Sequence, residues 1–351
     1  MASSLHKHPY PISKDRIQGM LIGLAVGDAA GAPGSQTYNK DYKFSGRLQT
    51  ATRVLSRYHA ARFLAVGQWT DDLEMTLCMI RSMIDKGCYN QMDVTERYIN
   101  WARSSFIIDK DINELFKKNK IKTVLGYQKH YNRRFSSDEG LAIQSNSSLM
   151  RCSALALIYD NDVAIQDCRL THPNRINIDC NLVYVNAVRL ALYGCEKSQI
   201  LETIVTIAQT DEVKSVLADV RNRVSRQIQG RNKDWVVNTL YCALIGLMYC
   251  TSYKEALQWV VNIGDSDTNT NGSVLGALVG AYYGYQELCV DDDTKYNVDL
   301  ILNLDTSTAD HKRPPEYTLH DFEEVTQQLY DKFASEDKDE SKGKDQESPD
   351  E

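Results

Sequence analysis

The sequence predicts an all-α protein. Apolar residues recur at helical spacing through most of the chain, whereas the alternating apolar and polar runs typical of half-buried strands are weak. Proline is absent from residues 34–172 and again from residues 174–313, which suits an almost entirely helical body because proline breaks helix interiors. Two segments also carry a glycine at every fourth position, a spacing that favours close packing of helices.

The two glycine-spaced segments are expected to pack against each other. Ser13 can cap the first helix, and its glycines share one face. Each glycine costs a helix interior about 1 kcal/mol relative to alanine, so close backbone contact is the expected compensation. An antiparallel crossing would bring Asp28, late in the first segment, near Asp265 and Asp267 before the second. We name these sets the first glycine ladder (Gly19, Gly23, Gly27 and Gly31) and the second glycine ladder (Gly272, Gly276, Gly280 and Gly284).

Further helices are predicted along the chain, and one of them is expected to be buried. The segment from Thr70 to about Lys86 is apolar on most sides, which is typical of a helix enclosed in a core. Residues 34–67 show no clean period. The remaining helical patterns cover residues 94–105, 112–129, 149–159, 180–194, 198–209, 212–229, 234–250, 254–262, 272–288 and 320–334.

The chain is expected to form a single domain. Prolines mark residues 1–12 as an irregular lead-in, and helical patterns fill residues 13–334. Residues 335–351 hold eight acids, three lysines and no large apolar side chain, so we predict a disordered acidic tail. A length of 351 residues is compatible with one large core that encloses a pocket. We expect a monomer.

Charge and cysteine content narrow the function classes. The net charge is −7, most of it in the tail, and no basic stripe is present, which disfavours nucleic-acid binding. The nine cysteines form no C-x-x-C pair, and free thiols inside helical patterns favour a reduced, cytoplasmic location. No segment has the apolar h-region of a signal peptide or the roughly 20 apolar residues that span a bilayer, so no membrane association is expected.

Two acidic clusters lie at predicted helix starts. Thr70-Asp71-Asp72-Leu73-Glu74 opens the buried helix, and Asp265-Ser266-Asp267-Thr268 precedes the second glycine ladder. Capping of helix N-termini is the simplest explanation of either cluster alone. Buried carboxylates are costly unless they are compensated, however, and carboxylate and hydroxyl oxygens are ligands that magnesium prefers. Together the clusters predict a shared magnesium site, with a two-metal site as the alternative to a single ion.

Two further stretches can shape a ligand pocket. Ser145 to Arg151 is a small polar segment that enters a helix, and its backbone N–H groups together with Arg151 would suit phosphate or another anion. An ordinary capped helix is the alternative. His172 follows in Thr171-His172-Pro173, although a lone histidine is more often structural than catalytic. The other six histidines show no ligand spacing, which disfavours a zinc site.

Taken together, these segments resemble the ADP-ribosylglycohydrolase family. Five motifs occur in the family's order between residues 13 and 290. They are Gly19-x-x-x-Gly23-Leu24-Ala25-Val26-Gly27-Asp28-Ala29-Ala30-Gly31, Trp69-Thr70-Asp71-Asp72-Leu73-Glu74-Met75, Asn146-Ser147-Ser148-Leu149-Met150-Arg151, Thr171-His172 and Gly264-Asp265-Ser266-Asp267-Thr268.

The resemblance implies a compact orthogonal helical bundle with two divalent cations, magnesium or alternatively manganese, at the bottom of a cleft. It also implies a substrate in which an ADP-ribosyl group is joined through ribose C1″ to a protein side chain or a small molecule. Asp71 and Asp72 would then be catalytic, since either can orient the attacking water. The implied metal ligands are Thr70, Asp71, Asp72, Asp265, Asp267 and Thr268, and the implied substrate-binding residues are Asn146, Ser147, Ser148, Arg151 and His172.

Departures from the family pattern bear on specificity. Ser145 and Ser147 stand where the family's polar loop has glycines, and Ile263-Gly264 replaces a glycine pair. Ser35 stands at a glutamate position that is functional in members that cleave serine-linked ADP-ribose, so an arginine-linked substrate is favoured over a serine-linked one. A catalytically silent ADP-ribose-binding or structural relative is the main alternative. An all-α isoprenoid synthase would explain Asp71-Asp72-x-Glu74 but fits the later acidic motif poorly.

Overall fold

The computed structural model describes residues 11–36, 42–49, 52–54, 62–117, 121–307 and 309–335. The predicted lead-in and acidic tail lie almost wholly outside these ranges, so the domain boundaries stay predictions. None of the helices described there is both long and apolar enough to cross a membrane. All nine cysteines fall within the described ranges as free thiols, and most of them are buried.

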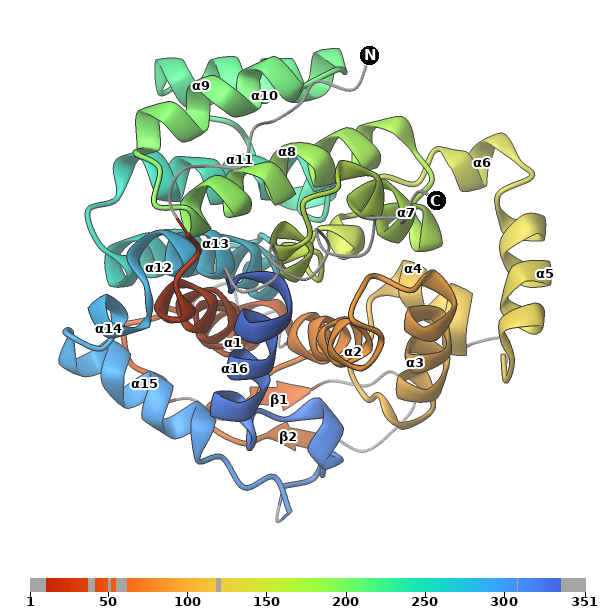
Figure 1. Cartoon of the computed structure of the whole chain (residues 1–351), viewed down its shortest axis with the longest axis horizontal. Coiled ribbons are helices and arrows are strands. Elements are labelled where there is room, and N and C mark those ends of the chain that lie inside the picture. Colours follow the sequence, from red (N-terminus) through yellow and green to blue (C-terminus); the bar gives the residue numbers. More distant parts are fainter. Residues whose placement is uncertain are drawn as a thin grey trace, which may run out of the picture.

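The all-α prediction is confirmed, because helices build the body of the molecule (Figure 1). Two short strands, β1 Thr52–Val54 and β2 Arg62–Leu64, pair antiparallel at its edge. The α-helices are α1 Lys14–Gln36, α2 Asp71–Lys86, α3 Gln91–Ser104, α4 Lys110–Ile112, α5 Val124–Arg134, α6 Asp138–Leu141, α7 Asn161–Thr171, α8 Arg175–Leu192, α9 Lys197–Ile207, α10 Asp211–Asn222, α11 Val236–Tyr249, α12 Tyr253–Val261, α13 Thr268–Tyr283, α14 Tyr285–Leu288, α15 Asp292–Leu302 and α16 Phe322–Phe333. A π-helix, η1 Asn113–Lys117, and the 3₁₀ segments η2 Asn146–Ser148, η3 Ser153–Leu157, η4 Gly230–Asn232 and η5 Pro315–Tyr317 complete the elements.

Two predicted helices are interrupted in the structure. Residues 112–129 divide between η1 and α5, and residues 149–159 form the short 3₁₀ segment η3 instead of an α-helix. Arg151 explains part of the second difference. Its Nη1 donates a hydrogen bond at 2.9 Å to the carbonyl oxygen of Ser147, which an α-helix would give to a backbone N–H four residues further on.

Two other predicted helices end early at residues with positive φ. Helix α10 ends at Asn222 because Arg223 adopts a left-handed φ of 54°, and α13 ends before Gly284, whose φ is 86°. Helices α7 and α15 were not predicted. Each begins after an aspartate, Asp160 or Asp291, whose carboxylate accepts a backbone N–H of the first turn, and this capping pattern was the available signal.

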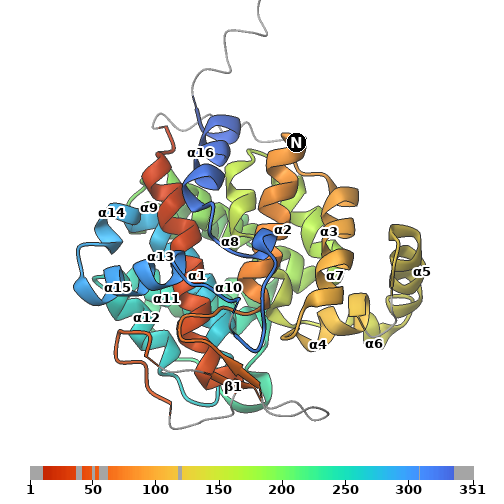
Figure 2. The ribbon, with the colours of Figure 1, turned by 90° about the horizontal axis from the view of Figure 1, so that it is seen from below.

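The two glycine ladders pack against each other, which confirms the predicted antiparallel crossing of α1 and α13 at the centre of the molecule (Figures 1 and 2). A Cβ atom on Gly23 would lie 2.3 Å from the carbonyl oxygen of Gly276, and one on Gly27 would lie 2.1 Å from that of Gly272. Only glycine allows two backbones to approach this closely. The crossing places the last turns of α1 beside the start of α13.

Other helices enclose the central pair. Helices α8, α11 and α12 pack against α13, whereas α2, α14 and α16 pack against α1. Two buried tyrosine hydroxyls bind backbone carbonyls of the pair: Tyr184 of α8 donates to Val274 at 2.9 Å, and Tyr253 of α12 donates to Gly23 at 2.8 Å. Helix α2 contacts both α1 and α13, and the residues of its first turn are buried.

Candidate active site

The candidate site is built where the N-terminus of α2 meets the crossing of α1 and α13. Asp28 of α1 caps α2: its Oδ2 accepts the backbone N–H groups of Thr70 at 2.9 Å and Leu73 at 3.2 Å, and its Oδ1 accepts Thr70 Oγ1 at 2.6 Å. Thr70, the alternative capping residue, makes no side-chain cap bond. Sequence reasoning placed Asp28 near this point but gave it no role.

Asp72 joins α2 to α13. Its Oδ1 accepts Ser273 Oγ at 2.6 Å, and its Oδ2 accepts Asn269 Nδ2 at 3.1 Å and faces Thr70 Oγ1 at 3.2 Å. Asn269 Oδ1 is buried and has no hydrogen-bond partner among the described residues. Neither Asn269 nor Ser273 was predicted. Their spacing of four residues just after the acidic motif places both on one face of α13, which was the signal available.

Asp71 faces the segment between α3 and α4. The residue is 3% exposed, and its Oδ2 accepts the backbone N–H of Asp109 at 2.7 Å. Asp109 caps α4 through its own Oδ1, which accepts the N–H groups of Asp111 and Ile112. Burial, followed by the neighbouring Asp111 carboxylate, raises the pKa of Asp109 to about 6. An acid that belongs to no predicted motif therefore lies beside Asp71.

The second acidic motif contributes one carboxylate to this region. Asp267 Oδ1 accepts Ser35 Oγ at 3.2 Å, and its Oδ2 accepts Asn146 Nδ2 at 2.9 Å. Thr268 is buried, and its Oγ1 donates to a backbone carbonyl of α1 at 2.6 Å. Asp265 instead lies exposed on a turn, with a φ of 57°. The structure thus brings Asp267 and Thr268 to the site and leaves Asp265 at its outer edge.

Three buried carboxylates around the N-terminus of α2, those of Asp28, Asp71 and Asp72, have no basic partner among the described residues. Burial, reinforced by neighbouring acids, raises the pKa of Asp28 to about 7 and of Asp71 to about 8, and it raises the pKa of Asp72 well above the ordinary value. Across the described ranges, no lysine or arginine bonds to any of these three. Glu74, one turn along α2, differs because Arg313 pairs with both of its oxygens, with Nη2 2.7 Å from Oε2. An arginine therefore neutralises Glu74, and the three aspartates stay uncompensated.

The oxygen donors at this point suit a hard divalent cation. Carboxylate, amide and hydroxyl oxygens are the ligand types that magnesium prefers, and the buried Oδ1 of Asn269 has no hydrogen-bond partner among the described residues. In the part of the chain that the structure describes, no three acidic, histidine or cysteine side chains form a group that could hold a metal ion as they stand. Cation binding at this cluster is therefore a proposal.

The polar loop from Ser145 to Arg151 lies against the cluster. Asn146 attaches it to α11 and α13, because its Nδ2 donates to Thr239 Oγ1 at 3.0 Å as well as to Asp267. The side chains of Ser147 and Ser148 are buried, and Ser148 Oγ accepts Asn181 Nδ2 at 2.9 Å. The loop is therefore held from several helices.

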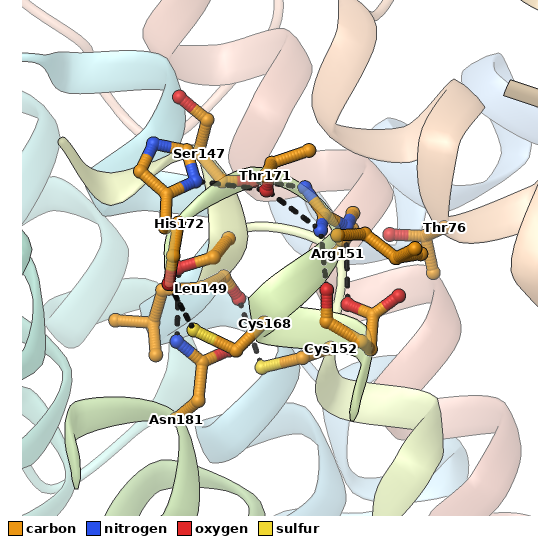
Figure 3. Close-up of polar contacts among 12 residues, drawn as sticks. Thr76, Ser147, Leu149, Arg151, Cys152, Cys168, Thr171, His172 and Asn181 are labelled. Carbon is orange, nitrogen blue, oxygen red and sulfur yellow. Dashed lines mark hydrogen bonds and ion pairs between the residues drawn. The ribbon is translucent and has the colours of Figure 1, made fainter. Parts of the chain in front are cut away.

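Arg151 is fully buried at the end of this segment, and its guanidinium points toward Thr171 (Figure 3). Its Nε donates to Asp167 Oδ2 at 3.1 Å, and its Nη2 donates to Thr171 Oγ1 at 2.9 Å. Because these donors are used inside the fold, the direct contact with an anion that the sequence suggested would require the contacts to change. His172 is equally buried, with Nδ1 2.8 Å from Thr171 Oγ1 and Nε2 2.7 Å from Ser145 Oγ.

An open hollow of about 530 Å³ borders the loop and offers room for a ligand. Ser145 lines it beside Trp235, whose ring offers an apolar surface, and Lys110 and Arg231 add positive charge. Such a combination of one aromatic ring with a few polar groups is typical of small-molecule sites.

The fold and the site define an all-α enzyme in which buried acids from two helices face a polar loop. The family model described as ADP-ribosylglycohydrolase matches residues 9–297, and the chain belongs to that family. It is 23% identical over 283 residues to the ADP-ribosylarginine hydrolase Tri1 of Pseudomonas putida (strain GB-1), covering 77% of this chain and 71% of the relative. It is 24% identical to the ADP-ribosyl-[dinitrogen reductase] glycohydrolase of Rhodospirillum rubrum, covering 79% and 89%. A solved structure titled ADP-ribosylglycohydrolase-related protein complex aligns with a TM-score of 0.63 at 22% identity, covering 91% of this chain and 98% of the other.

Proposed function

We propose that this protein is a metal-dependent hydrolase that cleaves the bond between ribose C1″ of an ADP-ribosyl group and its acceptor, with an arginine-linked acceptor favoured over a serine-linked one. The observation that carries the proposal is the group of buried carboxylates of Asp28, Asp71 and Asp72, which have no basic partner in the described part of the chain and meet the first turns of α13 through Asp72. Family membership supports the reaction class. Family membership gives no support to the alternative interpretation of the chain as an isoprenoid synthase.

The proposed metal ligands are Thr70, Asp71 and Asp72 of the α2 start, with Asp267 and Thr268 of the α13 start. Magnesium, or alternatively manganese, would supply positive charge there that balances the carboxylates and polarises ribose hydroxyls. We propose that the site binds two ions and that Asp265 is a further ligand. Asp265 would have to reach the ions from its exposed turn.

The chain's own residues supply orientation and proton transfer. Asp71 or Asp72 orients a water toward C1″ and accepts its proton, the role that a carboxylate takes in glycoside hydrolysis. Asn146 fixes Asp267 through its 2.9 Å hydrogen bond. We propose that Ser147 and Ser148, whose side chains are buried, act through the shape of the loop against the diphosphate, and that Arg151 holds that shape.

Ser35 is the residue that bears on the acceptor. Its hydroxyl donates to Asp267 at 3.2 Å, at a position where members that cleave serine-linked ADP-ribose carry a functional glutamate. A hydroxyl cannot replace a carboxylate as a general base at neutral pH. The protein is therefore expected to release ADP-ribose from arginine in preference to serine.

Release of ADP-ribose from arginine-linked and serine-linked peptides, with magnesium and with chelator, tests the proposal. Asp71→Asn is expected to reduce magnesium-dependent release by about 100-fold or more, as loss of a main catalytic group does. Asp85→Asn is the matched control, because Asp85 lies at the exposed end of the same helix. Tight ADP-ribose binding with no release from either linkage would instead identify a catalytically silent relative.

A further inference from the structure

A row of hydrogen bonds connects the rim of the hollow to His172. Arg134 Nη2 donates to Asp111 Oδ1 at 2.8 Å, and the two side chains form an ion pair. Ser145 Oγ lies 2.7 Å from Asp111 Oδ2 and 2.7 Å from His172 Nε2. Ser145 therefore stands between a carboxylate and an imidazole.

The row continues on the other side of the imidazole. His172 Nδ1 lies 2.8 Å from Thr171 Oγ1, and Arg151 Nη2 donates to that same Oγ1 at 2.9 Å (Figure 3). Thr171 and His172 are fully buried. The polar side-chain atoms of these two residues must therefore find their partners inside the protein.

The charged ends give the row a direction. Asp111 can only accept, so the single proton of Ser145 Oγ points to Asp111, and Ser145 must accept a proton from His172 Nε2. Arg151 can only donate, so Thr171 Oγ1 accepts from it and keeps its own proton available for His172 Nδ1. The Asp111 end therefore selects the Nε2–H tautomer of a neutral His172, and the Thr171 end is compatible with it. Burial, followed by the Arg151 and Arg134 guanidiniums, lowers the pKa of His172 to about 3, which agrees with a neutral ring.

Ser145 also separates His172 from the hollow. Ser145 lines the hollow, whereas His172 does not and is fully buried. Both imidazole nitrogens are used inside the row, so neither is available to a ligand while Ser145 keeps its position. With a glycine at position 145, the Nε2–H group would have no such hydroxyl partner.

We infer that Ser145 is a positioning residue that holds His172 as the Nε2–H tautomer and replaces it as the polar group facing a ligand in the hollow. The tautomer depends only on the geometry of the row. The identity of that ligand as ADP-ribose rests on the proposed function.

The tautomer is measured by ¹⁵N NMR of histidine-labelled protein, with the His172 signals assigned by their loss in His172→Gln. The wild type is expected to show the Nε2–H form, and an Nδ1–H form would overturn the inference. Asp111→Asn supplies a second test. Arg134 requires an acceptor, so the amide oxygen turns to Arg134 and the amide NH₂ to Ser145, which reverses the row and gives the Nδ1–H form. An unchanged tautomer in Asp111→Asn would count against the inference.

The ligand is tested by titration with ADP-ribose. In Ser145→Gly, the His172 nitrogen shifts are expected to move on addition of ADP-ribose and the Kd to change by about fivefold or more, whereas Ser145→Thr, which keeps the hydroxyl, stays within about twofold of wild type. If the His172 nitrogen shifts moved equally in the wild type and in Ser145→Gly, the inference that Ser145 separates His172 from the ligand would be overturned. Binding to no variant, with the Nε2–H tautomer present, would reject the proposed function and leave the positioning role standing. If Ser145→Gly fails to fold, the wild-type titration and Asp111→Asn still decide.

Discussion

At the scale of single residues, His172 links stability to pH. Burial and two nearby guanidiniums lower its pKa from an ordinary 6.5 to about 3. Between these values the unfolded chain binds a proton that the folded protein does not, so stability falls as the pH falls from about 6.5 and is unaffected above it. The wild type is expected to lose up to about 1.4 kcal/mol per pH unit through this residue, a loss that His172→Gln does not share.

Urea unfolding between about pH 7 and pH 5 measures this effect as a difference between the two proteins. His172→Gln is the less stable at neutral pH because it loses ring contacts, and the gap is expected to narrow as the pH falls. Subtracting the two curves removes the contributions of the aspartates, whose raised pKa values act in the opposite direction. His320→Gln is the control, since the side chain of His320 is 57% exposed. A gap that is constant with pH would contradict the prediction.

The sequence predicted part of the candidate site because the chemistry of some residue types can be recognised from the sequence alone. Three consecutive polar residues that open an apolar helix, such as Thr70 to Asp72, are visible as a cluster, and the structure places them against α13. Asp109 and Ser145 were not assigned roles, because their importance comes from contacts across the fold. The burial of Arg151 could not be predicted either, because nothing in the sequence distinguishes an arginine that pairs with Asp167 inside the fold from an arginine in an open groove.

At the scale of the elements, the α1–α13 crossing tolerates no side chain. Gly23→Ala would place a Cβ atom 2.3 Å from the carbonyl oxygen of Gly276, and a backbone atom cannot rotate away. The helices would have to separate, so we expect a loss of about 3 kcal/mol or more in the free energy of unfolding. Gly126→Ala in α5 is the control, because its Cβ would meet nothing closer than Thr123 Oγ1 at 3.3 Å, and it is expected to change stability by at most about 1 kcal/mol. Equal midpoints in urea for the two variants would refute the argument.

A second element-scale prediction concerns the segment before α16, which is attached to α2 by Arg313. Replacing Arg313 with methionine leaves Glu74 buried and unpaired, and the expected cost is about 3–5 kcal/mol. Arg81→Met breaks the Arg81–Asp321 pair between the same two parts of the chain. That pair is partly exposed, so the expected loss is about 1 kcal/mol or less. Chemical denaturation separates the two cases, and similar losses would show that burial of Glu74 does not set the cost.

The helical spacing of apolar residues predicted the central part of most helices and the face that each one buries, but it did not predict where the helices end. Periodicity reports which face a helix buries, whereas ends depend on caps and on φ at single residues such as Arg223. The glycine ladders were the exception that reached beyond local structure, because four glycines on one face are destabilising unless another backbone occupies that face. The ladders predicted that these two helices cross, and the crossing predicted that Asp28 lies near the start of the second helix.

At the scale of the whole molecule, the candidate site is expected to lower the free energy of unfolding. Three buried aspartates, for which the described residues supply no basic partner, lie at the centre of the core, where hydrophobic residues or an ion pair would cost less. A protein keeps such a group at a functional site and compensates for it elsewhere. Here two features beside the cluster supply such compensation: the close glycine packing of α1 against α13, and the pairing of Glu74 with Arg313.

If a divalent cation is the missing compensation, it must stabilise the native state, since the unfolded chain cannot gather the same oxygens. Magnesium at about a hundredfold excess over its Kd would add about 2.7 kcal/mol and raise the melting temperature, and chelator would reverse the rise. Asp72→Asn removes a proposed ligand and one of the repelling charges together. Its melting temperature is therefore expected to approach or exceed that of the chelated wild type and to show no response to magnesium, while Asp85→Asn keeps the wild-type response. A wild-type melting temperature that responds to neither magnesium nor manganese, with ADP-ribose present or absent, would show that the carboxylates are tolerated without a metal, and the catalytic proposal would then have to be rebuilt on Asp71 and Asp72 alone.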